Sequence, residues 1–120
     1  MEETFDSLLR QAPELAPCLP DLERAFDLLR RAFREGGKLL VCGNGGSAAD
    51  SEHIVGELMK GFDRRRALPR AEREHLQTLY PREGHYLAEH LQGALPAISL
   101  ASQTSLITAV ANDTAAEMAF

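Results

Sequence analysis

A short apolar run that passes directly into a glycine-rich turn constrains the fold of this chain more than any other feature. Residues 38 to 42 read KLLVC, and residues 43 to 47 read GNGGS. The apolar run shows no polar alternation, which predicts a strand covered on both faces. The turn is expected to lead into a helix at about residues 47 to 60. This segment therefore predicts one strand–turn–helix unit of an open α/β sheet with parallel strands.

The remaining patterns supply elements that fit such a sheet. Helices are expected at residues 2 to 10 and 21 to 35, with Asp21 as the N-cap of the second and Gly36-Gly37 at its end. A second buried strand is expected at 96 to 101, followed by a turn and a helix within 102 to 113. We expect four parts: a helical segment (1–37), the strand, turn and helix (38–61), a charged insertion with one or two helices (62–95), and the second strand and helix (96–120).

Composition excludes several classes of protein. A length of 120 residues allows one domain at most, and no apolar run approaches the roughly 18 residues of a membrane span. The acidic, amphipathic start does not resemble a signal peptide, so the cytoplasm is the expected compartment. Cys18 and Cys42 form no CxxC pair, and Cys42 is expected to be a buried, inert thiol. The net charge of −5 argues against nucleic acid as the main partner.

The glycine turn is suited to hold an anion. A tight turn into a helix leaves backbone N–H groups at the helix N-terminus, where the dipole favours negative charge. Glycine at positions 43, 45 and 46 lets the backbone approach a ligand closely. Asn44 offers an amide, and Ser47 is able to cap the helix or donate to a ligand oxygen. The spacing matches neither a Walker loop nor GxGxxG, so nucleotide binding is not the first choice, and a turn with no ligand is the alternative.

The helix after the turn carries a histidine and a glutamate four residues apart. His53 and Glu57 fall on one stripe with Asp50 and Lys60, so both side chains are able to reach the same atom. The apolar stripe of this helix is expected to hold Ile54, Val55, Leu58 and Met59. A His–Glu pair suits half of a metal site or an acid–base pair. The alternative is a solvated face with a helix-stabilising contact.

Residues 38 to 62 resemble the SIS (sugar-isomerase) domains of sedoheptulose 7-phosphate isomerases, also called phosphoheptose isomerases. The match is CGNGGSAADSEHIVGEL, and a weaker one is LPAISLASQTSLITAVANDTAAEMAF at 95 to 120. The resemblance implies an α/β fold, an SIS-type open parallel sheet flanked by helices, of which this chain holds the first half. It also implies a homotetramer in which the N-terminal helices form a central bundle.

The resemblance also implies roles for individual residues. The glycine turn (Gly43, Asn44, Gly45, Gly46 and Ser47) would contact a phosphorylated sugar, and Asp113 would add to the substrate pocket. His53 and Glu57 would bind the zinc found in some members, and Glu57 would also transfer the proton. The implied reaction converts sedoheptulose 7-phosphate to a heptose 7-phosphate by aldose–ketose proton transfer.

The chain departs from the family pattern in two places. Lys60-Gly61 stands where members usually have Gly-Arg, so the cationic group would be Lys60 or come from Arg64 to Arg66, unless that run is a solvated loop. The insertion at 62 to 95 is longer than the loop of compact members. We expect three of its residues to be ordinary surface histidines: His75, His85 and His90.

Three functions remain open from the sequence. The family's Ser/Thr-rich phosphate loop and its later Gln and His would lie beyond residue 120, so we expect an isomerase that is incomplete as given. The alternative is a non-catalytic SIS protein that senses a phosphosugar or binds the replication initiator DnaA, as some relatives do. A half-domain that acts as an interaction module is the third possibility.

Overall fold

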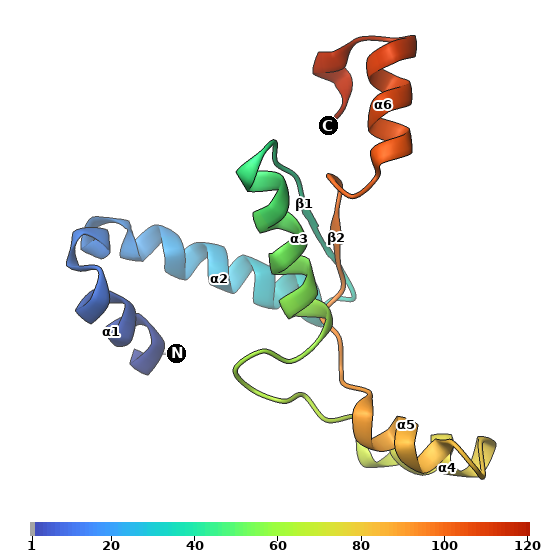
Figure 1. The fold of residues 1–120 in the computed structure, drawn as a ribbon. Helices are drawn as coiled ribbons and strands as arrows, with labels where there is room; N and C mark the ends of the chain where they lie inside the picture. The colour runs from blue at the N-terminus through green and yellow to red at the C-terminus, as the bar shows by residue number, and fades with distance from the viewer. Residues whose placement is uncertain (1) are drawn as a thin grey trace. The chain divides into compact units, whose positions relative to one another are not determined.

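The computed structural model describes residues 2 to 120, except for the side chains of residues 2 and 3. The chain folds into two compact units. The first ends at Gly37, and the second comprises Lys38–Phe120. Figure 1 labels the described helices and strands, and its colour runs along the chain from blue at the N-terminus to red at the C-terminus.

The first unit is helical. Helix α1 (Glu2–Gln11) is followed by a 3-10 helix, η1 (Pro13–Cys18), and by the longer helix α2 (Leu19–Arg34). Pro13 and Pro17 explain the interruption, because proline cannot donate to an α-helical ladder. Helix α2 begins before Asp21, with Pro20 in its first turn, so the prediction of Asp21 as the N-cap is wrong. Gly36 ends the helix at positive φ (+78°), as the sequence predicts.

The second unit is built on two parallel strands. Strand β1 (Leu39–Val41) pairs with β2 (Ala97–Ser99), and Leu40 faces Ile98 in the register. Helix α3 (Gly46–Met59) follows β1 and packs against β2 (Figure 1). The parallel strand–helix–strand arrangement predicted from the sequence is therefore confirmed. Because the strands are parallel, the glycine turn and the loop after β2 emerge at the same edge of the sheet.

One face of this sheet is open. Ala97 and Ser99 are buried, whereas Leu40 and Ile98 on the other face are 56% and 42% exposed. The prediction that the strands are covered on both faces is therefore wrong for the described residues. Cys42, which directly follows β1, is exposed and free, so the prediction of a buried thiol is also wrong. The reason is the same in both cases, because α3 supplies one covering layer and apolar composition cannot reveal whether a second layer is present.

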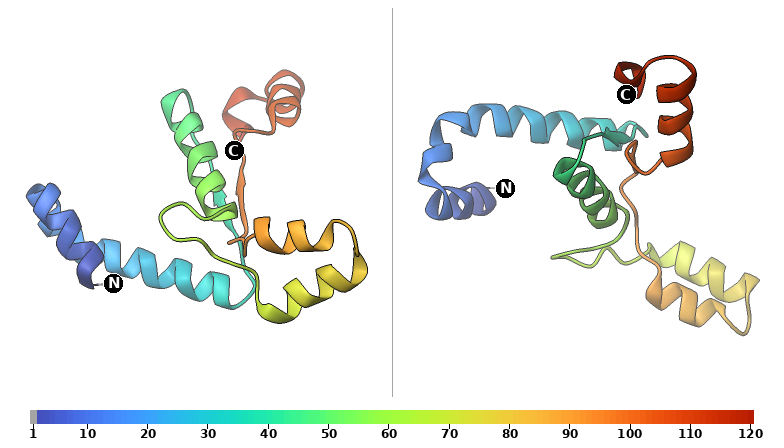
Figure 2. Two further views of the ribbon diagram at one scale, coloured as in Figure 1. Left: turned by 60° about the horizontal axis from the view of Figure 1, so that its bottom comes forward. Right: turned by 45° about the horizontal axis from the view of Figure 1, so that its top comes forward.

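The charged insertion forms a helical hairpin. Helix α4 (Arg70–Leu79) packs on α5 (Gly84–His90), and the two run side by side in opposite directions (Figure 2). The close approach requires Gly84, because a side chain there would collide with the Leu76 carbonyl oxygen. Ala88 is buried at this contact.

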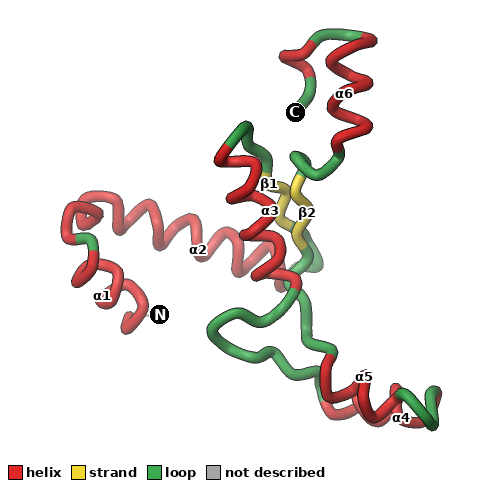
Figure 3. Tube along the Cα trace, in the orientation of Figure 1, coloured by secondary structure: helices red, strands yellow, loops and turns green. Residues whose placement is uncertain are grey.

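Helix α6 (Thr104–Asp113) follows β2, and a 3-10 helix, η2 (Ala116–Met118), packs beside it. Figure 3 shows loops at both ends of the short strands. None of the described helices is long and apolar enough to cross a membrane.

Candidate functional site

The glycine turn holds the backbone in a shape that only glycine adopts easily. Gly45 has positive φ (+58°) and is the residue that precedes α3. Gly43 has a different reason to be glycine, since a Cβ there would lie 2.5 Å from the Ser47 carbonyl oxygen. The turn is therefore folded back tightly against the first turn of the helix.

This folding leaves backbone donors free at the helix N-terminus. The N–H groups of Ser47 and Ala48 donate to the carbonyls of Asn44 (3.2 Å) and Gly45 (3.1 Å). In the described chain, the N–H groups of Asn44, Gly45 and Gly46 donate to no backbone acceptor. Three consecutive free donors at the positive end of a helix favour the approach of an anion.

Ser47 lies inside the helix and does not cap it. The helix begins at Gly46, and no side chain caps it. The proposed capping role of Ser47 is therefore wrong, because the glycine turn starts the helix one residue earlier than the sequence suggests. The exposed Ser47 hydroxyl makes no hydrogen bond within residues 2 to 120. It remains available to a ligand beside the free N–H groups.

His53 and Glu57 form the close pair that their spacing predicts. The His53 Nε2 and Glu57 Oε1 atoms are 2.9 Å apart. The His53 side chain is 77% exposed, and that of Glu57 is 31% exposed. The helix face that packs on the sheet carries the buried Ser51, which lies roughly 200° around the helix from His53. His53 therefore stands on an exposed side of α3, and Glu57 beside it is partly buried.

The donor set of the pair suits zinc but is too small to hold it. Imidazole nitrogen and carboxylate oxygen are ordinary zinc ligands, and a stable site needs at least three protein ligands. Across residues 2 to 120 no group of three or more His, Cys, Asp or Glu side chains could hold a metal ion. These residues could therefore supply two ligands and no more.

A buried pair of hydroxyl groups, which the sequence analysis missed, fixes α3 on the sheet. Ser51 Oγ donates to the Ala48 carbonyl (2.7 Å) and lies 2.7 Å from Ser99 Oγ. Since the Ser51 proton is used on Ala48, the Ser99 hydroxyl must donate to Ser51. Both residues are at least 96% buried, with exposures of 1% and 4%. The signal for Ser51 was its position between Ala48 and Val55 at helical spacing. Ile54 and Met59 of the predicted apolar stripe are instead 43% and 48% exposed, so the buried face lies further round the helix than predicted.

Arg66 holds the other end of α3, and this was also missed. Its guanidinium donates to three carbonyl oxygens at the helix end, those of Glu57, Leu58 and Lys60. Its Nε donates to the Gly93 carbonyl at 2.8 Å. A cation at a helix C-terminus is favoured by the dipole. Of the run Arg64 to Arg66, this residue is therefore structural, while Arg64 and Arg65 are exposed.

Asp113 is not joined to the other predicted residues. It is the last residue of α6, and its carboxylate accepts a hydrogen bond from the Asn112 amide (2.8 Å). Within the described chain no hydrogen bond or ion pair links it to residues 43 to 57. Its role in the pocket stays a prediction. The three histidines of the insertion are exposed, as predicted.

Comparison with known proteins shows which family and which relatives this chain is similar to. Residues 8–93 match the SIS domain. A phosphoheptose isomerase of Roseiflexus sp. is 40% identical over 121 residues, which cover all of this chain and 46% of the relative. One from Helicobacter hepaticus is 31% identical over 120 residues, which cover all of this chain and 48% of the relative. One from Rhodospirillum rubrum is 35% identical over 99 residues, which cover 82% of this chain and 39% of the relative.

The chain thus spans just under half the length of the curated relatives that match it from end to end.

Proposed function

We propose that this chain, which belongs to the SIS domain family, is the substrate-binding part of an enzyme that isomerises a phosphorylated sugar. The observation that carries the proposal is the His53–Glu57 pair on a helix that begins at a glycine turn with free donors. The relatives that match the chain from end to end are named phosphoheptose isomerases. The proposed reaction converts sedoheptulose 7-phosphate to a heptose 7-phosphate.

The glycine turn is proposed to bind the sugar phosphate. The free N–H groups of Asn44, Gly45 and Gly46 would donate to anionic or hydroxyl oxygens of the substrate, and the Ser47 hydroxyl would add one more donor. From Gly46 to His53 the helix rises by about 10 Å. An extended sugar phosphate of six or seven carbons has roughly this length. One substrate could therefore reach from the turn to the pair, with Asp113 proposed to add to the same pocket.

Glu57 is proposed to transfer the proton. Interconversion of an aldose and a ketose moves a proton between adjacent carbons through an enediol, and a carboxylate can take it from one carbon and return it to the next. The hydrogen bond from His53 Nε2 would orient the Glu57 carboxylate. Alternatively His53 would turn toward the substrate carbonyl and stabilise the charge that develops on its oxygen.

Zinc is a proposed cofactor, with His53 and Glu57 as two of its ligands. When bound, such an ion would polarise the substrate carbonyl. Further ligands would have to come from outside the residues described here.

We also propose a homotetramer that works in the cytoplasm. Cys18 and Cys42 are both free, which suits a reducing compartment. The open position of the His53–Glu57 pair supports assembly, because catalysis of this kind needs a site from which water is excluded.

The proposal is tested by replacing the matching segment of the Roseiflexus relative with this chain and measuring isomerase turnover of sedoheptulose 7-phosphate. In this hybrid, Glu57→Gln should lower turnover by about 10²- to 10⁴-fold, because an amide keeps the size of the side chain but cannot accept the proton. Substrate affinity should be largely kept. Bound metal is measured on the same sample, so that loss of zinc is distinguished from loss of the base.

Glu52→Gln is the matched control. Glu52 lies on the same helix, and its carboxylate accepts a hydrogen bond from Ser102 Oγ (2.9 Å), away from the pair. This variant should keep turnover near that of the parent hybrid. Full turnover in Glu57→Gln with unchanged metal would reduce Glu57 to a surface contact and would favour the non-catalytic phosphosugar-binding alternative.

A further inference from the structure

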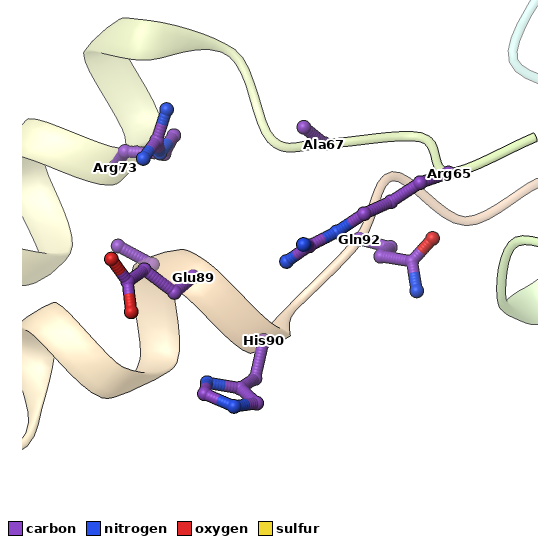
Figure 4. A pocket seen from close by; sticks show the side chains of 7 residues that line it. Arg65, Ala67, Arg73, Glu89, His90 and Gln92 are labelled. Atoms are coloured by element: carbon purple, nitrogen blue, oxygen red, sulfur yellow. The ribbon is translucent and has the colours of Figure 1, made fainter.

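We propose that the α4–α5 hairpin carries a second binding site, separate from the glycine turn, for the phosphate group of a small molecule. The site is a pocket of about 560 Å³ between the hairpin and the strand-like segment that leads into it. Its lining residues are Arg65, Ala67, Arg73, Ala88, Glu89, His90 and Gln92. Figure 4 shows Arg65 and Arg73 reaching into the same space from two different segments.

The two arginines of this pocket, Arg65 and Arg73, form no ion pair within the described chain, and the lining also carries one acid, Glu89. Arg70, on the same helix as Arg73, is instead paired with Glu74 at 2.6 Å. The Glu89 carboxylate lies 3.2 Å from His85 Nε2, outside the pocket lining. With Glu89 counted, the two guanidinium groups still leave the pocket lining positive, in a chain of net charge −5.

The frame that carries Arg65 is fixed by backbone contacts. Gln92 Oε1 accepts hydrogen bonds from the N–H groups of Gly61 and Arg66, both at 3.2 Å. The Gly93 N–H donates to the Arg66 carbonyl at 2.7 Å, and Ala67 forms an antiparallel bridge with Gln92. A charged side chain on such a clamp loses less freedom on binding than one on a loose loop.

A phosphate group is the ligand chemistry that fits best. Planar guanidinium groups donate two parallel hydrogen bonds to phosphate oxygens, and two such groups suit a dianion. The His90 ring, whose Nδ1 bonds to the Tyr86 carbonyl (2.8 Å), points away from the two arginines in Figure 4, so the arginines are the proposed phosphate donors. The pocket volume is within the range of small-molecule sites.

The test is a titration of the ¹⁵N-labelled 120-residue chain with inorganic pyrophosphate, followed by NMR. We expect saturable shifts of the amides of residues 65 to 67, 73 and 88 to 92, independent of any shifts at residues 43 to 47. The double variant Arg65→Gln/Arg73→Gln should weaken the first response by about tenfold or more. Added salt should weaken it as well. Both arginines are exposed, and circular dichroism checks that the variant keeps its helices.

Arg70→Gln is the matched control, because it removes one charge from the same helix without touching the pocket lining. It should change the affinity by less than about twofold. Two results would overturn the proposal. One is an unchanged response of the double variant, and the other is an equal loss in Arg70→Gln, which would indicate general charge attraction without a site.

Discussion

Gly45 stands at positive φ (+58°) where the chain turns into α3, a conformation that β-branched side chains rarely adopt. We expect Gly45→Val to weaken binding of inorganic phosphate at residues 43 to 47, because the free N–H groups would no longer point at one place. Ser47→Ala should weaken it only in part, since the main-chain donors remain. Both effects are read from amide shifts during a phosphate titration.

Gly45→Val could instead leave the affinity for phosphate unchanged while circular dichroism shows the helix intact. Phosphate binding would then not depend on close approach of the turn to the ligand. Gly43→Ala is not a suitable control. A methyl group there would meet the Ser47 carbonyl and disturb the turn itself.

At the residue scale, sequence reasoning succeeded where a side chain acts through its own spacing. The distance from His53 to Glu57 follows from helix geometry alone, and the pair forms as predicted. The role of Ser51 could not be predicted in this way, because its partner Ser99 is distant in sequence. Arg66 binds carbonyl oxygens only six to nine residues before it, but the path of the loop that brings it back to the helix end cannot be derived from helical spacing. Such contacts appear only when tertiary structure brings the segments together.

Among the elements, α3 depends on contacts at both of its ends. The glycine turn begins it, and Arg66 binds the carbonyl oxygens where it finishes. The boundaries predicted for this helix, 47 to 60, differ from the observed Gly46–Met59 by one residue at each end. The helices of the insertion were harder to place. Their sequence is mostly charged and polar, and their packing depends on the small residues Gly84 and Ala88.

We expect Arg66→Gln to destabilise the second unit by ~1–2 kcal/mol, because the charge at the helix C-terminus and its bonds to the carbonyl oxygens are lost. The rate of backbone amide hydrogen exchange should rise at the last turn of α3. It should also rise at residues 92 to 95, which include Gly93, the partner of Arg66 Nε. Arg64→Gln removes an exposed charge two residues away and should have no such effect. Equal exchange rates in both variants would mean that water binds the carbonyl oxygens at the end of α3 as well as Arg66 does.

The whole molecule leaves much of its apolar surface uncovered. Its fully buried apolar residues, among those described, are Ala88 and Ala97. A chain of 120 residues that folds alone usually buries large side chains as well. Composition could not reveal this, because it counts apolar residues without showing what covers them. The chain spans under half the length of the curated relatives that match it from end to end.

In the first unit this surface predicts self-association. Leu22, Phe26 and Leu29 form a stripe on α2 at helical spacing and are 36%, 43% and 37% exposed. Leu22 and Phe26 also line an apolar cavity of about 310 Å³ with Phe5 and Leu8 of α1. Two helices that present one apolar side to solvent gain stability by packing against the same side of another copy.

Light scattering of the 120-residue chain at micromolar concentration should therefore give the mass of an assembly, and a tetramer if the helices form the central bundle. Phe26→Glu should shift the mass toward the monomer, because burial of an unpaired carboxylate in the bundle is unfavourable. Leu28→Glu is the matched control: Leu28 is 57% exposed and lies roughly 200° around the helix from Phe26. It should leave the assembly intact. A monomer for the unmodified chain would rule out the proposed bundle, and equal dissociation in both variants would place the contact on a different face of α2.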